Sequence, residues 1–103
     1  ATYNSPELTR RLGGILRKVL GADNVLTKEP VMGAEDFGRF SLENTIPSCM
    51  IWLGAVDPEK VARTRKDGTP LPSLHSPLFA PLPEPTIRTG IKTLVTSVIG
   101  LMK

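Results

Sequence analysis

Apolar residues recur at three- and four-residue spacing near the start of the chain. The recurring positions are Leu8, Leu12, Ile15, Leu16, Val19 and Leu20. Ser5 is a favourable residue just before a helix, Pro6 suits a first turn, and Gly21 suits a helix end. The spacing predicts an amphipathic helix from Pro6 to about Leu20, lying on an apolar surface.

Gly13 and Gly14 fall inside this predicted helix. Each lowers helix propensity by about 1 kcal/mol relative to alanine. We therefore expect the helix to depend on tertiary contacts rather than on its own stability.

Two segments have the composition of β-strands. The first is short, at 24–27. The second, at 48–56, is almost continuously apolar and lies between Pro47 and the pair Asp57-Pro58. Such a run is typical of a central strand that is buried on both faces of a sheet.

Helical signals return after the first predicted strand and at the end of the chain. Gly33 permits unusual backbone angles, and Glu35 and Asp36 suit a helix N-terminus, so a short helix is predicted through about Phe40 or Leu42. A proline-rich loop is expected from Asp57 to Pro83. A long helix is expected from Pro85, with one apolar stripe made by Ile87, Ile91, Leu94, Val95, Val98 and Met102.

This order of helix, strand, short helix, strand, loop and helix predicts an α/β fold of two or three layers. Two strands make a poor sheet alone. Strands from another part of the protein, or from another copy, are therefore expected to complete it.

Composition narrows the class of protein. The 103 residues allow one small domain, or a piece of one, spanning 1–103. The formal charge of +3 arises partly from Lys60, Arg63, Arg65 and Lys66, which lack interleaved aromatic residues, so no nucleic-acid partner is expected. No apolar run is long enough to span a membrane, and the first residues lack a signal-peptide pattern. The single cysteine, Cys49, is compatible with a reducing, cytoplasmic location.

The chain has one histidine, His75, within the run Leu74-His75-Ser76-Pro77. One histidine can ligate a metal but cannot enclose it, because a catalytic zinc site needs at least three protein ligands. No second histidine and no Cys-x-x-Cys spacing supplies the others. We therefore expect most of any metal site to lie outside this chain.

Several motifs, taken in order, resemble the C-terminal end of metal-dependent amidohydrolases. They are Met32-Gly33-Ala34-Glu35-Asp36-Phe37, Trp52-Leu53-Gly54, Leu74-His75-Ser76-Pro77-Leu78-Phe79 and Glu84-Pro85-Thr86-Ile87-Arg88-Thr89-Gly90. The family includes hippurate hydrolase, N-acyl-amino-acid hydrolases, auxin-conjugate hydrolases and related metallopeptidases. The resemblance covers nearly the whole chain and implies the C-terminal part of a three-layer α/β/α catalytic domain, after an inserted lid or dimerisation domain.

The resemblance implies a role for His75 as one ligand of a di-metal site holding zinc, manganese or a similar divalent metal. Glu35, Asp36, Gly33 and Ser76 would belong to the loops around the site. The family's general base comes from a Glu-Glu pair that this chain lacks. We therefore expect the chain alone to be inactive and to bind little or no metal.

Simpler explanations exist for each of these residues. An isolated histidine in a loop is ordinarily an exposed polar residue. Glu35 and Asp36 also fit plain helix-capping charges. Cys49 fits a small core residue rather than a nucleophile or a metal ligand.

Two functions remain open at this stage. The first is a segment of an amidohydrolase that cleaves an N-acyl amino acid or a similar small amide, with the rest of the catalytic domain as its partner. The second is a non-catalytic α/β module that acts through self-association or assembly with a partner chain. The sequence identifies neither the substrate nor the metal.

Overall fold

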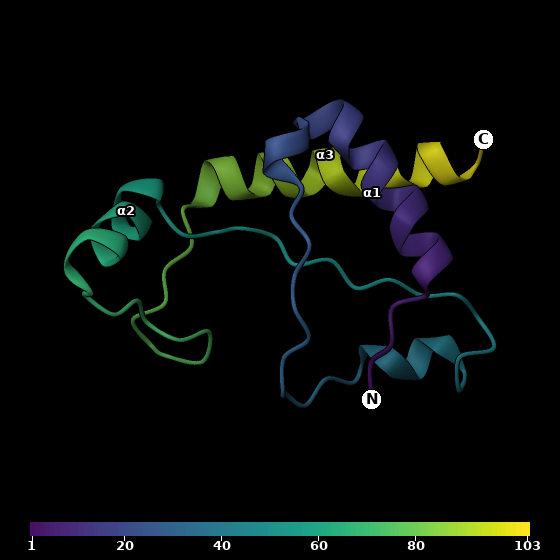
Figure 1. The fold of residues 1–103 in the computed structure, drawn as a ribbon, viewed down its shortest axis with the longest axis horizontal. Helices are drawn as coiled ribbons and strands as arrows, with labels where there is room; N and C mark the ends of the chain where they lie inside the picture. Colours follow the sequence, from purple (N-terminus) through teal and green to yellow (C-terminus); the bar gives the residue numbers. More distant parts are fainter. The chain divides into compact units, whose positions relative to one another are not determined.

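The computed structural model describes all 103 residues and contains helices but no β-strand (Figure 1). The α-helices are α1 (Pro6–Leu20), α2 (Pro58–Asp67) and α3 (Pro83–Leu101). Two short 3₁₀ helices, η1 (Ala22–Asn24) and η2 (Phe37–Ser41), complete the regular structure. The predicted α/β fold, and with it the three-layer α/β/α domain, is therefore wrong for this chain.

The segment predicted as a buried strand, 48–56, forms no ladder because no second strand lies beside it. Its backbone groups bond elsewhere: Ser5 N donates to Ser48 O at 2.9 Å, and Leu82 N donates to Ala55 O at 2.8 Å. The predicted strand at 24–27 is also absent, because Asn24 ends η1 and the following residues form no regular structure. β-Strands are stable only when paired, and an apolar run cannot provide its own partner.

The first predicted helix is confirmed with its bounds. Leu12 and Leu16 are its buried residues, as the apolar spacing indicated. Gly21 ends it at φ +92°, a region that favours glycine. Ser5 precedes the helix, but its hydroxyl makes no capping hydrogen bond.

Helix α2 occupies much of the segment that was predicted to be a loop, so that prediction was wrong for 58–67. Asp57 Oδ1 accepts a hydrogen bond from Glu59 N at 2.8 Å, and Pro58 occupies the first turn. Gly68 ends the helix in the left-handed conformation, at φ +74°. Asp57-Pro58 and Gly68 are thus typical residues for the start and end of a helix. The many prolines and charges around them favoured the prediction of a loop instead.

The short helix predicted after Gly33 is confirmed as η2, in 3₁₀ form. It ends in three consecutive residues with positive φ: Leu42, Glu43 and Asn44. Ser41 fixes this turn because its hydroxyl donates to Gly38 O at 2.6 Å and accepts from Asn44 N at 3.2 Å.

Helix α3 begins two residues earlier than predicted, at Pro83. Its buried residues are Thr93 and Ser97, whereas the predicted aliphatic stripe is exposed along the helix. Hydrophobicity alone would favour burial of the aliphatic stripe and exposure of Thr93 and Ser97.

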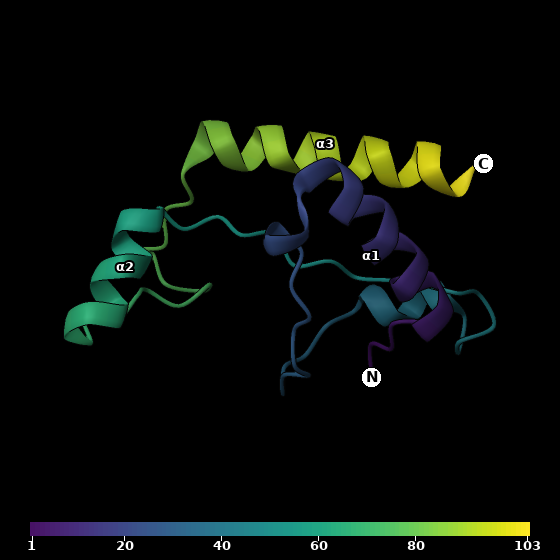
Figure 2. The ribbon, with the colours of Figure 1, turned by 45° about the horizontal axis from the view of Figure 1, so that its top comes forward.

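The chain divides into two compact units, one made of 1–52 and 93–103 and the other of 53–92. In the first, α1 lies against the C-terminal half of α3 (Figure 2). A Cβ on Gly100 would lie 2.8 Å from Ile15 Cδ1, so the side chain of Ile15 packs directly against the backbone of α3 there. Arg11 Nη2 donates to Gly100 O at 3.3 Å and Leu101 O at 3.1 Å, satisfying carbonyls at the end of α3. None of the helices combines the length and the apolar character needed to cross a membrane.

Candidate functional site

His75 lies in a tight turn of the 53–92 unit. Ser76 N donates to Ser73 O, and Phe79 N donates to Ser76 O, each at 3.0 Å. Ser76 Oγ accepts a further hydrogen bond from Leu78 N at 3.1 Å. Ser76 therefore has a clear local role, which is to hold the turn that follows the histidine.

The imidazole of His75 is exposed at this turn. The hydrogen bonds that shape the turn come from its neighbours and use neither ring nitrogen. A neutral imidazole with an accessible nitrogen is a good ligand for zinc and similar metals. The turn thus offers one metal-ligating group on a locally fixed backbone.

The acidic residues predicted near the site belong to the other unit, in the loop before η2. Glu35 Oε1 accepts a hydrogen bond from Phe37 N at 2.9 Å, so this carboxylate supports the start of η2. Asp36 lies 3.8 Å from Arg39 Nε, and both side chains are almost fully exposed. Such a surface ion pair contributes little to stability. Glu35 therefore fits the simpler explanation of a local helix-capping charge, whereas the side chain of Asp36 makes no capping hydrogen bond and is paired with Arg39.

Gly33 has ample space around it, because a Cβ there would meet no atom within 4 Å. Its φ is not positive, so its backbone angles do not require glycine. The backbone carbonyl of Glu35 accepts a hydrogen bond from Thr2 Oγ1 at 3.2 Å. This bond attaches the first residues of the chain to the loop before η2.

The predicted site residues are divided between the two units: His75 and Ser76 in one, Gly33, Glu35 and Asp36 in the other. The structure contains no group of three or more His, Cys, Asp or Glu side chains arranged to hold a metal ion. His75 is therefore not grouped with two further side chains of these kinds in this structure.

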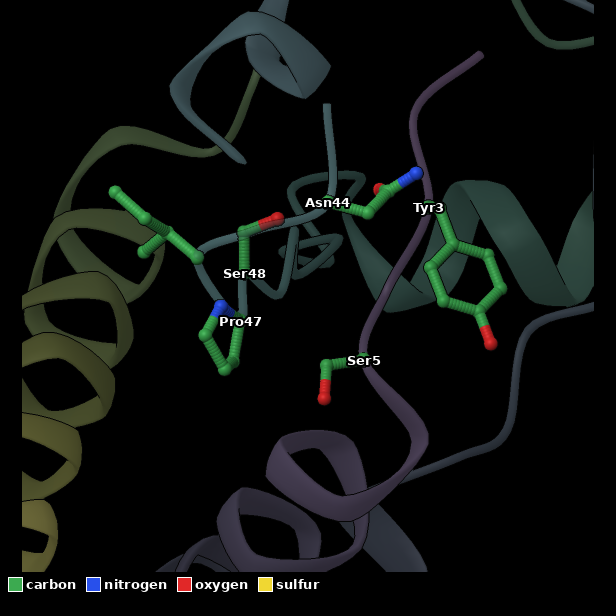
Figure 3. A pocket seen from close by; sticks show the side chains of 6 residues that line it. Tyr3, Ser5, Asn44, Pro47 and Ser48 are labelled. Carbon is green, nitrogen blue, oxygen red and sulfur yellow. The ribbon is translucent and has the colours of Figure 1, made fainter. Parts of the chain in front are cut away.

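A small pocket of about 110 Å³ lies within the first unit (Figure 3). The N-terminal segment contributes Tyr3 and Ser5, and the segment after η2 contributes Asn44, Pro47 and Ser48. Ser48 Oγ is buried there without a hydrogen-bond partner. The volume is enough for a few water molecules but not for an acylated amino acid.

Sequence reasoning missed this pocket, because its two walls are about forty residues apart along the chain. A partial signal was present in the polar run Glu43-Asn44-Thr45, which is typical of a turn. Nothing in the local sequence indicated that this turn would face Tyr3.

Cys49 is half-buried, and its sulfur accepts a hydrogen bond from Thr9 Oγ1 at 3.5 Å. The thiol thus helps to attach the 47–52 segment to α1. This arrangement matches the expectation that Cys49 is a packing residue.

The cations of the 60–66 cluster lie on α2 and are exposed. At the end of the same helix, hydrogen bonds from Thr69 lower the pKa of the Asp67 carboxyl. One of them joins Thr69 N to Asp67 Oδ1 at 2.9 Å. Asp67 is therefore a local anchor for the helix end rather than a proton donor.

Comparisons with known protein families, curated proteins and solved structures give no match.

Proposed function

We propose that this chain is a segment of a metal-dependent amidohydrolase and contributes His75 as one ligand of the metal site. The observation that carries the proposal is the exposed imidazole of His75, held on a turn whose hydrogen bonds come from its neighbours. The motif order around Glu35, Trp52 and His75 supports the same family.

An imidazole such as that of His75 is a suitable ligand for a divalent metal, but this chain would supply only that one ligand. A metal in such an enzyme polarises the amide carbonyl and activates water as the nucleophile. His75 would hold that metal together with ligands from the rest of the catalytic domain. The substrate would be an N-acyl amino acid or a similar small amide, and the products a carboxylate and an amine.

The other predicted site residues would shape the loops around the metal site rather than bind the metal. Ser76 fixes the turn that presents His75, because its hydroxyl and carbonyl bind Leu78 N and Phe79 N. Glu35 and Asp36 would order the loop before η2. The free thiol of Cys49 supports a reducing location such as the cytoplasm.

The test uses the polypeptide encoded by the complete reading frame that contains these residues. It would be loaded with zinc or manganese and assayed on a panel of N-acyl amino acids, with bound metal measured by elemental analysis. His75→Ala is expected to lower both metal content and turnover by orders of magnitude. Lys60→Ala, on exposed α2, is the control and should change neither.

Two results would overturn the proposal. One is a complete reading frame that supplies no further His, Asp or Glu ligands. The other is a His75→Ala protein that retains full metal content and turnover.

A second candidate function is a non-catalytic assembly module. The observation that favours it is the exposed aliphatic face of α3, because contiguous apolar surface often marks an interaction site. The dependence on metal distinguishes the two candidate functions. An assembly module would associate equally well before and after treatment with a chelator, whereas the hydrolase would lose its turnover.

A further inference from the structure

We draw no further inference here: the strongest candidate, the exposed aliphatic face of α3 around Ile91, Leu94 and Val98, is an unpartnered apolar surface, and nothing in the structure shows what covers it.

Discussion

The side chain of Asn4 pairs with the backbone of Met50 through two hydrogen bonds. Asn4 Nδ2 donates to Met50 O at 2.9 Å, and Met50 N donates to Asn4 Oδ1 at 2.8 Å. The amide thereby takes the place that a neighbouring strand would occupy. These bonds attach the apolar 48–52 segment to the residues before α1.

Replacing Asn4 by alanine is expected to destabilise the first unit by about 1–2 kcal/mol, because two partly buried backbone groups of Met50 lose their partner. Asn4→Asp keeps the acceptor and loses the donor, so its cost should also be substantial. Chemical denaturation measures both values. An Asn4→Ala variant as stable as the parent would show that the pair contributes nothing.

A methyl group at Gly100 is expected to disrupt the contact between α1 and α3. Its Cβ would lie 2.8 Å from Ile15 Cδ1 and 2.9 Å from Ile15 Cγ2, so Gly100→Ala should cost about 1–2 kcal/mol despite its better helix propensity. Gly14→Ala is the control, because nothing lies within 4 Å of its Cβ, and it should stabilise α1 by about 1 kcal/mol.

Thermal unfolding compares the two variants. Ile15→Val in the Gly100→Ala background should recover part of the loss by removing the closer carbon. A stabilised Gly100→Ala variant would contradict the close approach of the helices.

Leu42 has φ +45° while its side chain is 61% exposed, so it accepts backbone strain without strong burial in return. Leu42→Gly is therefore expected to maintain or raise stability, by up to about 1 kcal/mol. Leu26→Gly is the control: Leu26 is exposed and has no positive φ, so its replacement should be slightly destabilising. Equal effects in denaturant titrations would argue against strain at Leu42.

Asp67 is expected to titrate below the usual range for aspartate, because Thr69 hydrogen bonds lower its pKa. A lowered folded-state pKa gives stability that is present above the unfolded pKa of about 3.9 and is lost as pH falls through the folded pKa. The C-terminus of α2 should therefore fray in acid. NMR titration of the Asp67 carboxyl carbon gives the midpoint, and Thr69→Ala should move it upward. An unchanged titration midpoint in Thr69→Ala would show that Thr69 does not lower the pKa of Asp67.

The isolated 103-residue chain is expected to bind zinc or manganese weakly, because His75 is its single histidine and one imidazole does not make a tight site. Isothermal titration measures the affinity. A sub-micromolar site with one metal per chain would mean that ligands assemble in a way not proposed above.

Local signals explain the parts of the fold that the sequence predicted. Helix α1 follows from the spacing of Leu12 and Leu16, which is independent of the rest of the chain. Helix α2 was not predicted: Gly68 marks its end, but the nearby prolines led to the prediction of a loop over 58–67. The 48–56 segment could not be predicted in the same way, since a strand depends on a partner that its own residues do not specify.

The candidate site shows the same division. His75 stands out in the sequence as the one histidine, but the hydrogen bonds of Ser76 that shape its turn are visible only in the structure. The burial of Ser97 in place of Leu94 also runs against hydrophobicity. It is possible because the serine hydroxyl bonds within its own helix.

The two bonds from Arg11 to the carbonyls of Gly100 and Leu101 have a mechanical consequence. The buried face of α3 near Ser97 is satisfied internally and imposes no directional restraint on α1. The guanidinium and the side chain of Ile15 both meet α3 at Gly100. Arg11 and Ile15 are one turn apart on α1, so a polar and an apolar contact fasten the two helices at the same turn near the C-terminal end of α3.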